Sequence, residues 1–322
     1  MRLCLGLAKK GLGNVTPNPM VGSVIAVGRK IIGQGYHKKF GETHAEVNAV
    51  NSVLDKKLLK KATLYVNLEP CSHFGKTPPC ADLIIKYKIP RVVIGCVDTF
   101  AKVSGRGIKK LKKSGIDVKT GVLEDKCRIL NKTFFTYHEK KRPYIILKWA
   151  QTADGFIDRK RSFGSPQKAL QISNQKNKIA THKLRSEVQA IMIGTNTALL
   201  DNPRLTTREV KGRNPLRITI DRDLKIPRRF NLLDKSAPTL IFTAKKVARE
   251  RNLEFAKINF KKNIIPQILR ELCKRNIQSL LVEGGAQLLN SFIKNNLYDE
   301  TRVFTSKTKI KDGVKAPVLK LV

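Results

Sequence analysis

Several features of specialised protein classes are missing from this sequence. Its six cysteines are scattered over 322 residues, which is unlike the disulfide framework of a small secreted domain and favours a cytosolic location. No apolar run approaches the ~20 residues that span a bilayer, so we expect no membrane helix. The opening stretch "MRLCLGLAKKGLGNV" lacks the long apolar core and cleavage site of a signal peptide, so we expect none.

Aromatic and acidic residues are also scarce. Aromatic residues make up 6% of the chain. It contains 25 acidic residues and 64 Lys and Arg residues, which gives a net charge of +39. This charge would attract nucleic acid or small phosphorylated substrates. The lysines are spread along the chain, however, and few aromatic side chains are present to stack on bases. We therefore expect a small phosphorylated substrate and do not expect nucleic acid as a partner.

The residues that are present predict a layered α/β protein. The chain is 41% apolar and long enough for about two domains. Strand-like and helix-like stretches alternate in both halves, as in α/β folds. In the first half we expect a hairpin over 20–36, strands over 62–68, 91–97 and 116–122, and helices over 43–54, 80–88 and 105–115.

A charged run over 139–142, followed by Pro143 and a new buried strand, marks the best domain boundary, so we expect domains at 1–142 and 143–322. The second half has helical patterns over 173–187, with Ser173 as a plausible N-cap, and over 286–297. Strands are expected over 188–195, 215–222, 238–244 and 278–285. The last apolar pieces lie at 301–307 and 316–322, and the latter is long enough for one strand.

One group of residues carries recognisable chemistry. His44 and Glu46 stand at the start of an expected helix, Cys71 follows Pro70, and Cys80 begins the next helix. Zinc accepts His nitrogen and Cys thiolate, and a catalytic site keeps three protein ligands and an open position. An adjacent Glu that is not a ligand can then move protons between water and a leaving amine, as in zinc deaminases. We predict that His44, Cys71 and Cys80 hold one zinc ion and that Glu46 is catalytic.

Other interpretations of this group exist. Each cysteine alone could be a small core residue, and His44 alone could be an ordinary residue at a helix end. A structural zinc site would normally have four protein ligands, and His73 could supply the fourth. The spacing also differs from the general Pro-Cys-x-x-Cys signature, because eight residues separate Cys71 from Cys80.

The motifs "TPNPMVGSVI", "GETHAEVNAV" and "LEPCSHFGKTPPC" resemble the deaminase half of the bifunctional deaminase/reductase family of riboflavin biosynthesis. The stretches "YIILKWAQTADGFID", "HKLRSEVQAIMIGTNTALLDNPRLTTR" and "LLVEGGAQLLNSF" resemble its reductase half. The resemblance implies a cytidine-deaminase-like three-layer domain followed by a dihydrofolate-reductase-like domain. It also implies that relatives continue for several tens of residues past the last residue here, so that the second domain is C-terminally short.

The resemblance implies two reactions. The first is zinc-dependent hydrolytic deamination of 2,5-diamino-6-(5-phosphoribosylamino)pyrimidin-4-one, with Asn18 beside the pocket. The second is NADPH-dependent reduction of the ribosyl chain, which gives 5-amino-6-(5-phosphoribitylamino)uracil. Rival functions are a deaminase with an impaired reductase half, a base deaminase acting on RNA, and a basic nucleic-acid binder with a structural zinc. The sequence is compatible with a homo-oligomer.

The resemblance also carries over binding residues in the second half. The positions that match cofactor contacts are Ala150, Gln171, Thr197, Asp201, Arg222, Gly285, Ala286, Gln287, Leu288, Leu289, Asn290 and Ser291. The positions that match substrate contacts are Ala169, Arg185, Leu205, Arg208 and Glu283. Two positions depart from the family pattern, because Ala169 replaces a hydroxyl residue and Gln171 replaces a tryptophan, which puts these two contacts in doubt.

Overall fold

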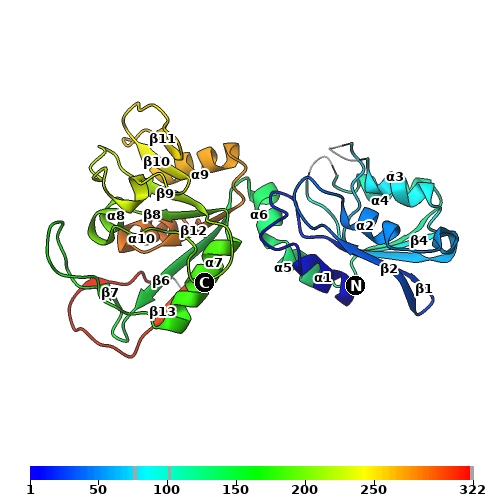
Figure 1. The fold of residues 1–322 in the computed structure, drawn as a ribbon, viewed down its shortest axis with the longest axis horizontal. Coiled ribbons are helices and arrows are strands. Elements are labelled where there is room, and N and C mark those ends of the chain that lie inside the picture. The colour runs from blue at the N-terminus through cyan, green and yellow to red at the C-terminus, as the bar shows by residue number, and fades with distance from the viewer. Residues whose placement is uncertain (75–77, 101–102, 320–322) are drawn as a thin grey trace. The chain divides into compact units, whose positions relative to one another are not determined.

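The fold is seen in a computed structural model that describes residues 1–74, 78–100 and 103–319. The chain forms two compact units, Met1–Lys141 and Arg142–Val322, which are described separately below (Figure 1). Among the described residues, every helix is too short or too polar to cross a membrane.

The first unit alternates helices and strands. Its elements are α1 (Arg2–Lys9), β1 (Gly22–Val27), β2 (Lys30–Tyr36), α2 (Ala45–Asn51), the 3-10 helix η1 (Lys56–Lys61), β3 (Thr63–Leu68), α3 (Cys80–Lys86), β4 (Arg91–Cys96), α4 (Arg106–Lys113), β5 (Asp117–Lys119), α5 (Glu124–Leu130) and α6 (Lys132–Lys140).

These elements build a three-layer domain. The sheet has the strand order β2-β1-β3-β4-β5; β1 is antiparallel to β2 and β3, while β3, β4 and β5 run parallel. Alternate residues of β3 face opposite sides. Leu64 and Val66 pack in the core formed with α2, α3 and α4, whereas Tyr65 packs with residues of α1. The expected cytidine-deaminase-like arrangement is therefore present, with helices on both faces of one sheet (Figure 1).

The second unit holds a larger sheet. Its elements are β6 (Tyr144–Gln151), β7 (Phe156–Asp158), α7 (Gln175–Glu187), β8 (Ala190–Ile193), α8 (Thr195–Asp201), β9 (Leu216–Ile220), the 3-10 helix η2 (Asn231–Leu233), β10 (Thr239–Thr243), β11 (Leu253–Lys257), α9 (Ile264–Lys274), β12 (Ser279–Glu283), α10 (Ala286–Lys294), β13 (Glu300–Thr305) and β14 (Val314–Lys315).

Within the described residues, seven strands form a parallel sheet in the order β11-β10-β9-β8-β12-β6-β13. One face carries α9 and α10, and the opposite face packs against α8 and the end of α7. Strands of such a sheet are buried on both faces, which explains the near-continuous apolar runs of β6 and β12. Because the strands are parallel, their carboxyl ends share one edge, which is where ligands bind in open α/β sheets.

Three details differ from the sequence-based expectations. Asn174, and not Ser173, caps α7, because its side chain accepts a hydrogen bond from the Asn177 amide. No strand forms over 316–319; a short strand, β14, precedes this stretch and pairs with β7. Residues 320–322 of the expected strand lie outside the described part. Helices α5 and α6 also fill a region for which no helix was expected.

Candidate functional site

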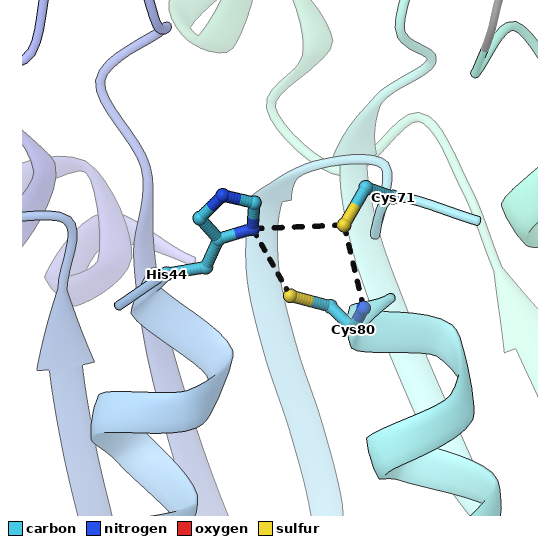
Figure 2. A group of neighbouring side chains, drawn as sticks. All are labelled: His44, Cys71 and Cys80. Carbon is cyan, nitrogen blue, oxygen red and sulfur yellow. Dashed lines mark hydrogen bonds between the residues drawn. The ribbon is translucent and has the colours of Figure 1, made fainter. Parts of the chain in front are cut away.

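The predicted metal ligands lie together in the first unit. His44 caps the N-terminus of α2, Cys71 follows β3, and Cys80 is the first residue of α3. His44 Nδ1 lies 3.3 Å from Cys80 Sγ and 3.6 Å from Cys71 Sγ (Figure 2). The backbone amide of Cys80 donates to Cys71 Sγ at 3.3 Å. Residues 75–77 of the cysteine spacer are not described.

The donor set fits a zinc ion. Ligands at about 2.1 Å for nitrogen and 2.3 Å for sulfur in a tetrahedral site lie about 3.6 Å apart, close to the spacings between His44 Nδ1 and the two sulfurs. The three ligand atoms all lie within 4.8 Å of one another. His73 is not part of this group. Because the described residues supply three donors and no fourth ligand, one position is left open, as in a catalytic zinc site.

The protonation states suit metal binding. Hydrogen bonds from Cys80 and His44 hold the pKa of the Cys71 thiol below its usual value, which favours its thiolate form. The hydrogen bond with Cys71 raises the pKa of His44. The pKa of Cys80 is raised because it shares its proton with Cys71 and is buried. A cation that replaces these protons would find its ligands already facing one another.

Glu46 lies in the first turn of α2 and is only 3% exposed. Burial raises the pKa of its carboxyl group to about 7, while the charge of His44 favours ionisation. A carboxyl group whose pKa is near neutrality can both accept and release a proton, which is what general acid–base catalysis needs.

Asn18 is connected to the same site through His37. His37 Nδ1 donates to the Thr43 carbonyl at 3.1 Å, so its Nε2 accepts the hydrogen bond from Asn18 Nδ2, also at 3.1 Å. The His37 ring contacts the His44 ring edge-on, with 5.5 Å between centroids. Burial lowers the pKa of His37, in keeping with a neutral ring. Asn18 is therefore held beside the metal ligands.

A buried carboxylate supports the loop that carries Cys71. Glu69 precedes Cys71 by two residues and is 3% exposed. Its two oxygens accept four backbone hydrogen bonds, at 2.9–3.2 Å, from Asp98, Gly105, Gly107 and Ile108. Gly107 must be a glycine, because a Cβ there would lie 2.1 Å from the Pro70 carbonyl oxygen. The metal-ligand loop is thus bonded to the N-terminus of α4.

The second unit contains a cavity of about 750 Å³ at the carboxyl ends of its strands. Its lining includes Trp149 and Ala150 of β6, Thr197 of α8, and Glu283 with Gly284 at the end of β12. Gly284 and Gly285 have positive φ values of 63° and 71°, which glycine adopts without strain. The turn lets the N-terminus of α10 face the cavity, where its unpaired amides suit a phosphate.

Most of the predicted binding positions in the reductase half line this cavity. They are Ala150, Gln171, Arg185, Thr197, Asp201, Leu205, Glu283, Gly285, Ala286, Gln287, Leu288 and Ser291. Five others are not among the lining residues: Ala169, Arg208, Arg222, Leu289 and Asn290. Leu289 is fully buried in the core, and the Arg222 side chain is 65% exposed after β9.

Charged side chains of the cavity form buried pairs. Arg185 donates two hydrogen bonds to Glu283, at 2.7 and 3.1 Å, and both side chains are about one-tenth exposed. Burial alone would raise the pKa of Glu283, but Arg185 and Lys148 hold it below the usual value. Our sequence interpretation missed Lys148, Asp158 and Arg161, which also line the cavity. A lysine inside the apolar run of β6 was an available signal for the first.

Arg208 does not line the cavity, but its backbone is bonded to α7, which carries Arg185. The Arg208 amide donates to His182 Nδ1 at 3.0 Å, and His182 lies one turn before Arg185 on α7. Burial and the charges of Arg185 and Arg208 lower the pKa of His182, whereas Glu209 and Glu283 oppose this effect. The neutral ring is therefore the form that accepts this hydrogen bond.

We expect acid to weaken the second unit through His182. Its pKa in the folded state lies below the 6.5 of a free histidine side chain. The stability that this shift contributes is therefore fully present above pH 6.5 and is lost as the pH falls toward the folded pKa. His182 is the one histidine, and Trp149 the one tryptophan, of residues 142–322. Denaturation followed by tryptophan fluorescence at about pH 7.5 and 5.5 would measure the loss. His182→Asn, which keeps an acceptor, should reduce this pH dependence; an unchanged dependence would contradict the assignment.

Comparison with protein families identifies both units. Residues 1–96 match the cytidine and deoxycytidylate deaminase zinc-binding region, and residues 143–306 match the RibD C-terminal domain. The chain is 41% identical over 319 residues to riboflavin biosynthesis protein RibD of Aquifex aeolicus, covering 98% of this chain and 88% of that protein. The RibD protein of Synechocystis is 39% identical, with 98% and 86% covered.

Solved structures show the same two-domain fold. The deaminase/reductase of Thermotoga maritima superposes with a TM-score of 0.87 at 40% identity, covering 98% of this chain and 88% of that one. RibD of Acinetobacter baumannii gives a TM-score of 0.86 at 29% identity, with the same coverage. These matches confirm the family resemblance seen in the motifs, and with it a zinc-dependent deaminase followed by an NADPH-dependent reductase. The chain belongs to the RibD family of bifunctional riboflavin-biosynthesis enzymes.

Proposed function

We propose that this chain deaminates 2,5-diamino-6-(5-phosphoribosylamino)pyrimidin-4-one and then reduces the ribosyl chain of the product to give 5-amino-6-(5-phosphoribitylamino)uracil. The observation that carries the proposal is the grouping of His44, Cys71 and Cys80 within 4.8 Å beside buried Glu46. The Thermotoga maritima relative is described as acting on these two types of substrate. We assign deamination to residues 1–142 and reduction to residues 143–322.

In the deaminase unit, His44, Cys71 and Cys80 would hold zinc, and Glu46 would move the protons. Bound zinc lowers the pKa of a water molecule, which makes it a nucleophile at neutral pH. Glu46 takes up the proton of the attacking water and delivers it to the departing amine, which leaves as ammonia. Asn18, oriented by its hydrogen bond to His37, would contact the pyrimidine. Burial of Glu46 keeps bulk water from competing for the proton.

In the reductase unit, NADPH would supply the hydride, and the chain would orient it against the sugar. The glycine turn at 284–285 and the N-terminus of α10 offer amides to the cofactor. Arg185 would contact the phosphorylated substrate, and Glu283 fixes its guanidinium through two hydrogen bonds. We further propose a cytosolic location; the sequence is compatible with a homo-oligomer.

The direct test supplies the diaminopyrimidine substrate with and without NADPH and identifies the products by mass spectrometry. Without NADPH, the deaminated ribosylamino compound and ammonia should accumulate. With NADPH, the ribityl compound should replace it. Deamination without any reduction would leave the chain a deaminase only. Release of ammonia from a base in RNA, with none from the free pyrimidine, would favour the RNA deaminase instead.

Cys80→Ser should strongly reduce zinc binding, because a serine hydroxyl is a poor substitute for a thiolate in a three-ligand site. Metal analysis of purified protein should find one zinc ion per chain in the wild type and a large loss in the variant. Cys273→Ser is the matched control, since Cys273 lies on α9 of the other unit. Full zinc occupancy in Cys80→Ser would reject the ligand assignment.

A further inference from the structure

The cavity of the second unit is bordered by a long irregular segment. Residues 159–173 lie between β7 and the N-cap of α7, and they form no helix or strand (Figure 1). Most of this segment is exposed, yet its last residues, Leu170 to Ser173, line the cavity. Exposed irregular backbone does not hold a fixed position without specific anchors. The position of Leu170–Ser173 therefore depends on what bonds this segment to the sheet.

Asp158, the last residue of β7, joins the two ends of the segment. Its Oδ1 accepts a hydrogen bond from the Leu170 amide at 3.0 Å, across twelve residues of sequence. Its Oδ2 accepts from Arg161 Nε at 2.8 Å and from Arg161 Nη2. The Asp158 carboxylate thus bonds both to Leu170, which closes a loop over residues 158–170, and to the guanidinium group of Arg161.

Arg161 then bonds this loop to α8, which also lines the cavity. Its Nη2 donates to Asp201 Oδ1 at 2.5 Å, and its Nη1 donates to the Leu200 carbonyl at 3.2 Å. Both partners belong to α8, and Asp201 is one of the proposed cofactor positions. The Arg161 side chain is only 4% exposed, although the residues around it face solvent. A planar guanidinium can bond two carboxylates and a carbonyl at once, which a lysine ammonium does less well.

We propose that Arg161 is a positioning residue for NADPH binding: with Asp158 it fixes the Leu170–Ser173 side of the cavity, and it orients Asp201. The proposal rests on the proposed reductase function. Gln171, at the family's tryptophan position, uses its side-chain amide to bond the Ser173 carbonyl at 2.7 Å. Residues 170–173 therefore offer the cofactor backbone groups and a polar side chain in place of an aromatic ring. The position of these residues depends on the bonds that Asp158 and Arg161 make. The positive charge of Arg161 also offsets part of the negative charge of Asp158 and Asp201, which would otherwise repel the phosphates of the cofactor more strongly.

The test measures NADPH binding directly, through the fluorescence of Trp149, which lines the same cavity. Arg161→Gln should raise the dissociation constant of NADPH about tenfold, as loss of about 1.4 kcal/mol would do. Arg161→Lys should restore part of the affinity. Hydrogen exchange of peptides covering 159–173 should speed up in Arg161→Gln and slow again when NADPH is added. The KM for NADPH should rise far more than kcat falls, because the lost interaction acts on binding.

Asp158→Asn is the matched partner variant. It keeps a side-chain oxygen for the Leu170 amide and removes the charge that pairs with Arg161. If the two residues act as one anchor, the double variant should bind NADPH no more weakly than the worse single variant. Deamination should be unchanged in all variants, since the substituted residues lie in the second unit and the deaminase residues lie in the first. If Arg161→Gln does not fold, Asp158→Asn is tested by the same two measurements, NADPH affinity and hydrogen exchange over 159–173.

Two results would overturn the inference alone: unchanged NADPH affinity and exchange in the folded variants, or additive effects of the two substitutions. A wild-type protein that binds no NADPH would instead reject the proposed reductase function, and this inference with it.

Discussion

Replacing Glu46 with glutamine should slow release of ammonia from the pyrimidine by at least ~10²-fold, the usual contribution of a general acid–base residue. Glutamine has nearly the same shape but cannot take up the proton of the attacking water. Because Glu46 is not among the three grouped ligands, zinc content should stay at one ion per chain. Ammonia release in a coupled assay and metal analysis of the same preparation measure the two quantities.

Two controls make this test specific. Glu42→Gln changes an exposed carboxylate two residues before His44 and should have little effect. Reduction of the deaminated intermediate by NADPH should be the same in Glu46→Gln and the wild type. Near-normal ammonia release by Glu46→Gln would mean that another group transfers the proton.

Arg185→Met should destabilise the second unit by about 3–5 kcal/mol, because it removes both hydrogen bonds that Arg185 donates to the buried Glu283 carboxylate. The pair is held by two hydrogen bonds, at 2.7 and 3.1 Å, and both side chains are largely buried. Trp149 is the single tryptophan of the chain and lies in this unit, so its fluorescence during urea denaturation reports this unit. Reduction should also be lost, since the proposed substrate contact is gone.

The double variant Arg185→Met/Glu283→Gln separates charge burial from lost packing. Removing both charges should recover most of the stability lost in Arg185→Met, because no unpaired carboxylate remains. Reduction should not recover. Equal stability of Arg185→Met and the wild type would show that Glu283 finds another partner or water.

The sequence was most informative where chemistry restricts residue type. Zinc is bound by His and Cys side chains, so His44, Cys71 and Cys80 could be predicted as a group although Cys80 lies 36 positions after His44. Apolar runs likewise predicted the strands β6, β8, β9, β10 and β12. Their parallel arrangement follows from the helices between them.

Contacts that depend on the three-dimensional path of the chain could not be predicted in this way. Arg161 lies in the run "DRKRSFG", which looks like a solvated basic surface, and its partner Asp201 lies 40 residues further on. Nothing local distinguishes it from the other basic residues of a chain with 64 of them. The cap of α7 was misplaced by one residue for a related reason: Ser173 and Asn174 are both good caps, and only the backbone path selects Asn174.

The four backbone hydrogen bonds to Glu69 have a consequence for how the deaminase exchanges its metal. Because protein groups hold the loop before Cys71 to α4, the loop does not depend on the ion for its shape. A chelator should therefore extract zinc and leave a folded apoprotein, in contrast to small zinc domains that unfold without metal. Reloading should then be limited by the encounter of ion and ligands, so added zinc should restore deamination without refolding of the chain.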